Sequence, residues 1–321
     1  MPKPEKLLIN GQKIKPGCAI RIDLPLPPLY CGAQLTMPVH VLHGKKPGPR
    51  LFISAAVHGD ELNGMEIIRR LMLLPALKDL HGTLLAIPMV NVYGVLEKSR
   101  YLPDRRDLNR CFPGSPEGSQ AARLADLFMT EIVGKCSHGI DLHTAAVHRS
   151  NLPQIRADLD DAETLAMARA FNAPLLLNAK PRGGSLRKSA AEKGTTMLLY
   201  EAGEALRFDK HSILAGVQGI LGVLQQLDML PGRQHVAKQT GKPPMAHAST
   251  WLRAPVSGIF RSVATLGERI ERDAAIGSIS DPSTTAETQI HAPFSGLIIG
   301  RSEMPLVYEG EALYHIARLE E

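Results

Sequence analysis

Three side chains in the sequence have the types and spacing of a metal site. His58 and Glu61 are three residues apart in the stretch HGDE at 58–61, and a histidine and a carboxylate at this spacing can converge on one ion across a turn. His143, in the stretch DLHT at 141–144, would add a second imidazole. A His₂Glu set that leaves one position open for water is typical of catalytic zinc. Because the HxxE pattern is short, a surface turn with an incidental histidine is the alternative.

These side chains need elements that bring them together. The apolar run from Leu51 to Val57 predicts a buried strand that ends just before His58. Apolar residues at helical spacing then predict a helix over 62–74, which Pro75 stops. A second short strand at 140–143 carries the third ligand. Strand, ligand turn and helix in this order predict an α/β domain with the site at the carboxyl ends of its strands.

Further elements follow the same alternation. Strands are predicted at 83–88, 174–177 and 195–200, an edge strand with Pro38 at 37–43, and helices at 120–133, 161–171, 185–193 and 209–229. Ser119 and Asp209 are expected to cap two of these helices. The strand at 195–200 ends at Glu201, a carboxylate at the same edge of the predicted sheet.

Composition limits the classes of partner. The chain has 321 residues, 44% hydrophobic and 21% charged, with 37 Lys and Arg against 32 Asp and Glu. This balance permits anionic ligands, but no polybasic block predicts a nucleic-acid partner. No apolar run approaches the roughly 18 residues of a membrane span. The four cysteines form no CxxC pair, and the N-terminus lacks the apolar region of a secretory signal, so we expect reduced thiols and a cytoplasmic protein.

A charged loop follows the second predicted strand. Between Arg100 and Arg110 the sequence has four arginines and two aspartates. This excess of guanidinium groups favours an anion-binding loop, and a solvated charged loop is the alternative.

The C-terminal part of the chain contains a repeat. APVSGIF at 254–260 recurs as APFSGLI at 292–298, and two similar β units would bury their apolar faces against each other. We therefore predict a domain over 1–230, a linker over 231–249 and a β-sandwich domain over 250–321. The repeat resembles biotinyl and lipoyl domains, but its central turn at 280–283 has no lysine. The expectation is a structural or oligomerisation module, and hence a homo-oligomer.

Four motifs taken together resemble one known family. HGDE (58–61), RY…DLNRCFPG (100–114), DLHT (141–144) and YEAGE (200–204) closely resemble the succinylglutamate desuccinylase and aspartoacylase family, zinc hydrolases built on the carboxypeptidase A fold. The resemblance runs from about residue 35 to 230, and the repeat matches the β domain that members carry after it. It implies a mixed-sheet, carboxypeptidase-like α/β catalytic domain followed by a small all-β domain.

The resemblance also implies a role for each site residue. His58, Glu61 and His143 would bind one Zn²⁺ per chain, Asn109 and Arg110 would hold the substrate carboxylate, Arg100 would be the polarising cation and Glu201 the general base. Each role suits the side chain, since guanidinium matches a carboxylate and a carboxylate can move a proton to the leaving amine. The loop after Arg100 is longer than in aspartoacylase, so Arg105 and Arg106 are alternatives to Arg100, and Glu204 is an alternative to Glu201. Asp60 and Asp141 are expected to hydrogen-bond the ligand imidazoles or the backbone.

The resulting prediction is a zinc-dependent amidohydrolase that removes an acyl group from a small, anionic, amino-acid-like substrate. The acyl group itself stays open. The first alternative is a carboxypeptidase of short peptides, with the same machinery and a peptide leaving group. The second is a non-catalytic binding module on a decayed hydrolase scaffold. Retention of the three ligands and of Glu201 argues against decay.

Overall fold

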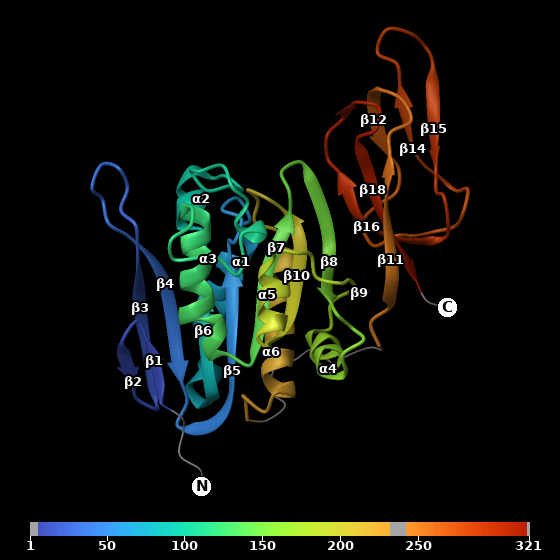
Figure 1. The fold of residues 1–321 in the computed structure, drawn as a ribbon. Coiled ribbons are helices and arrows are strands. Elements are labelled where there is room, and N and C mark those ends of the chain that lie inside the picture. Colours follow the sequence, from blue (N-terminus) through green and yellow to red (C-terminus); the bar gives the residue numbers. More distant parts are fainter. Residues whose placement is uncertain (1–5, 232–241, 320–321) are drawn as a thin grey trace.

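A computed structural model of the chain describes residues 6–231 and 242–319. A large mixed sheet runs through the molecule, with the N-terminal strands at one edge and the C-terminal strands at the other (Figure 1). Its strand order is β13-β16-β18-β11-β9-β8-β10-β7-β5-β6-β4-β3. The mixed α/β architecture agrees with the fold class expected from the sequence.

The strands have the following bounds. The large sheet contains β3 (Cys18–Leu26), β4 (Leu35–His43), β5 (Lys46–Ala55), β6 (His81–Ile87), β7 (His138–Ala145), β8 (Arg149–Ala157), β9 (Leu175–Asn178), β10 (Thr196–Glu204), β11 (Met245–Arg253), β13 (Arg269–Ile270), β16 (Gly296–Ser302) and β18 (Ala312–Leu319). A small hairpin pairs β1 (Leu7–Ile9) with β2 (Gln12–Ile14). Strands β5, β6, β7 and β10 are mutually parallel where they pair, so their carboxyl ends meet at one edge.

Helices cover both faces of this sheet. They are α1 (Asn63–Met72), α2 (Val92–Glu97), α3 (Gln120–Glu131), α4 (Ala162–Phe171), α5 (Leu186–Glu192) and α6 (Lys210–Gln226), with short 3₁₀ segments η1 (Pro75–Asp79), η2 (Leu108–Arg110) and η3 (Val133–Lys135). Alternate residues of β5 point to opposite faces: Ile53 packs in the core under α1, α4 and α6, whereas Phe52 packs in the core under α2, α3 and α5. Burial on both faces explains the continuous apolar run of this strand.

The expected helix caps are confirmed. The Ser119 hydroxyl accepts a hydrogen bond from the backbone N–H of Ala122, and the Asp209 carboxylate accepts one from Ser212. Both caps satisfy amides that the first turn leaves unpaired. No described helix combines the length and the apolar character needed to cross a membrane.

Three strands, β3, β4 and β8, differ from expectation. The segment at 37–43 lies in β4, but β3 pairs along its outer side, so β4 is not the edge strand. The prolines of β3 made this strand hard to predict from the sequence. An edge strand tolerates Pro25 because the missing N–H faces a side on which no further strand pairs. Strand β8 was not predicted at all, and it lies near the centre of the sheet.

The C-terminal residues form strands in two sheets. Besides the strands that join the large sheet, β12 (Gly258–Ser262), β14 (Ala275–Ser280), β15 (Glu287–His291) and β17 (Leu306–Val307) make a four-stranded sheet. The two copies of the repeat start β12 and β16, one in each sheet, and apolar side chains such as Phe260 and Ile298 pack between them.

The predicted linker is only partly described. Residues 232–241 lie outside the described part of the chain. Strand β11 begins at Met245, inside the predicted linker range, because it pairs in parallel with β9. Strand β16 also pairs with β8, with Gly300 opposite Asn151. The C-terminal strands therefore continue the sheet of the N-terminal part of the chain.

Candidate active site

The turn after β5 positions the first two ligand candidates. β5 ends at Ala55 and α1 begins at Asn63, so His58 and Glu61 lie on the connection at the carboxyl edge of the sheet. Gly59 lets this turn pack against α2, since a Cβ there would lie 2.0 Å from the carbonyl carbon of Gly94. The glycine of the HGDE motif is thus required by close backbone approach.

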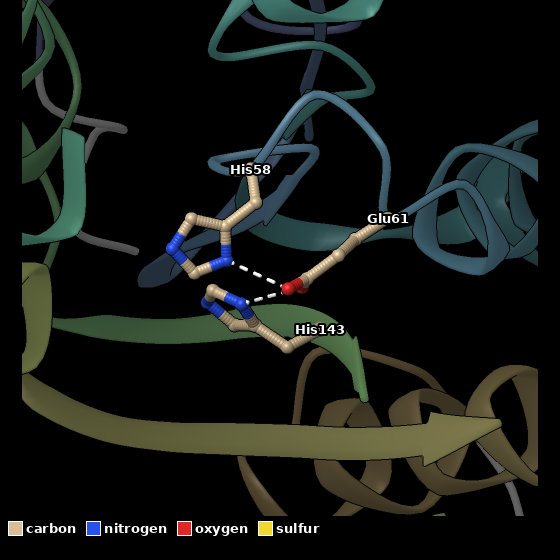
Figure 2. A group of neighbouring side chains, drawn as sticks. All are labelled: His58, Glu61 and His143. Atoms are coloured by element: carbon tan, nitrogen blue, oxygen red, sulfur yellow. Dashed lines mark hydrogen bonds and ion pairs between the residues drawn. The ribbon is translucent and has the colours of Figure 1, made fainter. Parts of the chain in front are cut away.

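Both candidate imidazoles face the same carboxylate (Figure 2). His58 Nδ1 is 2.7 Å from Glu61 Oε1, and His143 Nδ1 is 2.8 Å from Glu61 Oε2. One potential ligand atom from each of the three residues lies within 4.8 Å of the others, and all three residues are buried. The structure therefore brings together three residues that the sequence separates by up to 85 positions.

Carboxylates hold the outer nitrogens of both rings. His143 Nε2 is 2.7 Å from Asp141 Oδ2, and Asp141 Oδ1 accepts a hydrogen bond from the Ser54 hydroxyl. His58 Nε2 is 3.1 Å from Asp107 Oδ1. Ligand histidines in metal sites commonly donate their second N–H to a carboxylate in this way, which directs the other nitrogen to the ion. This arrangement fits a divalent cation.

One of these partners was missed in the sequence. Asp141 lies where it was expected, whereas Asp60 bonds neither ring, and its Oδ1 is buried with no hydrogen-bond partner among the described residues. Asp107 takes that position instead. The available signal was its place at the start of the DLNR motif, directly before the predicted substrate-binding pair.

The two imidazoles and Glu61 stabilise each other's charged forms. Burial opposes charge on both rings, yet the pKa of His143 lies well above its usual value because Asp141 and Glu61 face it, and the pKa of His58 is also raised. Burial likewise opposes charge on Glu61, but the two imidazoles hold its pKa far below the usual range. The site thus stabilises positive charge beside Glu61, the charge that a metal ion supplies.

The arginine of the charged loop that approaches this cluster is Arg100. Its Nη1 lies 3.4 Å from Glu61 Oε1, and its Nη2 donates to Asp107 Oδ2 at 2.9 Å. Arg105 and Arg106 are exposed and do not line the cavity beside the triad. The geometry favours Arg100 over these two alternatives as the polarising cation.

Asn109 and Arg110 lie in η2, next to the start of α5. Asn109 Oδ1 accepts a hydrogen bond from the backbone N–H of Leu186 at 2.9 Å, which ties η2 to the first residue of α5. Gly184 has a φ of +72°, and a Cβ there would lie 2.6 Å from the Arg110 carbonyl oxygen. Asn109 and Arg110 both line the cavity, as a pair that holds a substrate carboxylate must.

Strand β10 places Glu201 beside the cluster. In the parallel pairing of β10 with β7, Glu201 lies opposite His143, so the two side chains project from the same face of the sheet. Glu201 lines the cavity and accepts a hydrogen bond from Arg156 Nη1 at 2.8 Å. Glu204 instead accepts from the backbone of His148 and does not line the cavity. The geometry favours Glu201 over Glu204.

The family now follows from comparison with known proteins. The model of the succinylglutamate desuccinylase/aspartoacylase catalytic domain matches residues 47–227, more than half of the 321 residues. The chain belongs to this family.

Members of the family resemble the chain over nearly its whole length. The N-alpha-acetyl-L-2,4-diaminobutyric acid deacetylase of Halomonas elongata is 26% identical over 285 residues, which cover 85% of this chain and 83% of that protein. A succinylglutamate desuccinylase/aspartoacylase from Rhodobacter sphaeroides is 26% identical, with a TM-score of 0.81 over 94% of this chain and 96% of that one. The product-bound ectoine utilization protein EutE (DoeB) from Ruegeria pomeroyi, 22% identical, has the same fold, with a TM-score of 0.81 over 94% of each chain. The named relatives point to deacylase chemistry.

In this desuccinylase/aspartoacylase family member the cavity at the cluster of His58, Glu61 and His143 has a volume of about 590 Å³ and a cationic lining. Among the described residues its cationic side chains are Arg100, Arg110, Arg149, Arg156, Lys180, Arg182 and Arg187, and its carboxylates are Glu61, Asp141 and Glu201. Arg100 and Arg156 form ion pairs. The other five have no carboxylate at ion-pair distance within the described part of the chain. The cavity is therefore suited to an anionic ligand.

The C-terminal strands supply the opposite wall of the cavity. Ser249, Trp251 and His315 line it, although the sequence indicated no site residue in this region. The rings of Trp251 and His315 are stacked with centroids 4.7 Å apart, and the Arg149 guanidinium lies 5.2 Å from the indole centroid. Burial, with a smaller effect from Arg156, lowers the pKa of His315 to about 3. This imidazole is neutral at physiological pH.

Proposed function

We propose that this family member is a zinc-dependent amidohydrolase that removes the acyl group from a small N-acyl amino acid or a related carboxylate-bearing substrate. The observation that carries the proposal is the convergence of His58, Glu61 and His143 on one point. Asp107 holds the Nε2 atom of His58, and Asp141 holds that of His143. Two imidazoles and one carboxylate are the donor set of hydrolytic zinc.

The residues around that point have complementary tasks. Zinc, when bound, lowers the pKa of a water molecule and polarises the scissile carbonyl. Glu201 accepts the proton of the attacking water and delivers it to the leaving amine. Arg100 stabilises the negative charge that develops on the carbonyl oxygen. Arg110, with Asn109, holds the substrate carboxylate through charge-assisted hydrogen bonds, which would orient the amide toward His58, Glu61 and His143.

The charge of the cavity supports an anionic substrate. Five of its cations have no carboxylate partner among the described residues, and unpaired cations in a confined cavity attract anions and disfavour a substrate ammonium group. The Halomonas relative is named for a substrate with a side-chain amine. We propose that this chain instead prefers N-acyl amino acids without such an amine.

A metal measurement and a substrate panel test the proposal. Protein prepared without chelator is expected to contain about one zinc per chain and to release the amine from N-acetyl and N-succinyl amino acids faster than it cleaves dipeptides. Including N-acetyl-2,4-diaminobutyrate tests the charge preference separately. Exclusive cleavage of dipeptides would assign a carboxypeptidase. Absence of bound metal, no uptake of added metal and no turnover would assign a binding module.

A further inference from the structure

Arg156, on β8, contacts the proposed general base but is absent from every motif of the sequence. In the antiparallel pairing of β8 with β10, Arg156 lies opposite Leu199, and Glu201 lies opposite Gln154. Arg156 therefore reaches Glu201 diagonally across the two strands. Its Nη1 donates to Glu201 Oε2 at 2.8 Å, with 27% of the arginine and 17% of the glutamate side chain exposed.

This contact engages one carboxylate oxygen and leaves the other available. Within the described part of the chain, Glu201 Oε1 accepts no hydrogen bond, and Glu201 lines the cavity. A carboxylate at the wall of a cavity samples several rotamers unless a partner restrains it. A guanidinium bound to one oxygen removes that freedom, so that the second oxygen can take a proton from a fixed direction.

The surroundings of Arg156 argue against a purely structural role. Burial lowers the pKa of the Arg187 guanidinium to about 10, and Arg156 is the next cause. Arg156 also contributes to the lowered pKa of His315, after burial. The arginine thus lies among groups whose positive charge it disfavours. Half-buried ion pairs give little net stability, and locally unfavourable placements are typical of functional positions.

Strand β8 is held from both parts of the molecule. One side pairs with β10, and Gly300 and Arg301 of β16 pair with its first residues. The Gln154 amide, opposite Glu201, donates to the Ile299 carbonyl at 3.2 Å. The C-terminal strands therefore fix the register of the strand that carries Arg156.

We propose that Arg156 is a positioning residue that orients Glu201 for proton transfer. The proposal rests on the proposed function, in which Glu201 is the base. Arg156 itself does not touch the reacting atoms. Its contribution is to keep the carboxylate in the productive direction, and displacing a catalytic group by about 1 Å can cost on the order of 10²-fold in rate.

The test compares Arg156→Met, Arg156→Lys and Glu201→Gln on a substrate from the panel. Arg156→Met is expected to lower kcat by about 10- to 100-fold with little change in KM and with metal retained. Arg156→Lys, which can still donate one charged hydrogen bond, is expected to recover part of kcat. In a Glu201→Gln background, Arg156→Met should cause no further loss, because the two residues act as a unit.

Arg301→Met is the matched control. Arg301 donates to Glu303 at 2.9 Å, and its side chain is 26% exposed, close to the 27% of Arg156, but neither Arg301 nor Glu303 lines the cavity. Its loss should leave kcat unchanged. If Arg156→Met does not fold, Arg156→Lys carries the same comparison, both alone and in the Glu201→Gln background.

Several outcomes would overturn the positioning role. Raised KM with unchanged kcat in Arg156→Met would make Arg156 a substrate-binding residue, and full additivity with Glu201→Gln would separate the two residues. A normal Arg156→Met enzyme together with an inactive Glu201→Gln enzyme would refute only the positioning role. A Glu201→Gln enzyme with near-normal kcat would refute the base assigned in the proposed function.

Discussion

The two walls of the cavity are built in opposite ways. At the candidate metal site all four imidazole nitrogens of His58 and His143 contact carboxylates. The wall from the C-terminal strands is a stack of Trp251 on a neutral His315. Oriented charged groups can act in the chemical step, whereas flat neutral rings can pack against a ligand. Substitutions in the first wall should therefore change turnover far more than those in the second.

The largest effect is expected at the metal ligands. His143→Ala removes one of three donors, so zinc should be lost and activity should fall below detection, whereas Asp141→Asn should weaken metal affinity by about 10- to 100-fold. Elemental analysis and metal titration measure both. His211→Ala, at an exposed position of α6, is the control and should retain zinc. A fully zinc-loaded His143→Ala protein would contradict the ligand assignment.

A smaller loss is expected when the base is changed and the metal stays. Glu201→Gln cannot accept the proton of water, so kcat should fall by roughly 10²- to 10⁴-fold while zinc content is unchanged. Steady-state kinetics with parallel metal analysis test this. Near-normal kcat with zinc bound would move the base to another carboxylate such as Glu204.

Loss of Arg110, the residue proposed to hold the substrate carboxylate, should mainly weaken substrate binding. If Arg110 holds the substrate equally in the ground and transition states, Arg110→Ala should raise KM with little change in kcat. The expected increase is about 10- to 100-fold, the worth of a charged hydrogen bond of roughly 1.5–3 kcal/mol. Arg105→Ala, outside the cavity lining, is the control. A drop in kcat at constant KM would place Arg110 in the chemical step instead.

The last prediction concerns the stability of the fold at the second wall, and it involves no expected loss of turnover. The pKa of His315 falls from 6.5 to about 3 on folding, so below pH 6.5 the unfolded chain binds a proton that the folded chain excludes. His315 therefore does not destabilise the fold above pH 6.5. Below that pH it lowers the free energy of unfolding by about 1.4 kcal/mol per pH unit toward pH 3. Denaturant unfolding between pH 7 and 4 should show a steeper loss for the wild type than for His315→Phe. Parallel curves would mean that the imidazole is protonated in the fold.

The sequence predicts the first wall well because its residues follow strong local patterns. The strand before His58 is almost entirely apolar, and the strand that carries Glu201 is similarly clear, so both strands could be predicted, although β5 ends at Ala55 and β10 continues to Glu204. Asp107 could not be assigned, since its contact with His58 depends on how a long loop folds back. Strand β8 contains Pro153 and a register shift, because Asn151 and Gln154 pair with Gly203 and Glu201, and this extra residue interrupts the alternation that indicates a strand. Arg156 was hidden for the same reason.

The second wall was unpredictable for a different physical reason. Trp251 and His315 face each other across the antiparallel pair β11–β18, and such pairing depends on register that no local pattern reveals. Their place at the cavity further depends on the pairing of β16 with β8. Repeats in a sequence indicate that a β unit exists, but they do not indicate the surface on which it docks.

The continuity of the sheet also bears on aggregation. Leu175 and Leu177 of β9 form one apolar cluster with Ala246, Leu297 and Ile299 from the C-terminal strands. A chain cut after residue 230 would leave the hydrogen-bonding groups of β9 and this apolar strip open to solvent, and an uncovered edge of that kind recruits other strands. In the intact chain the C-terminal strands cover this edge, because β11 pairs with β9.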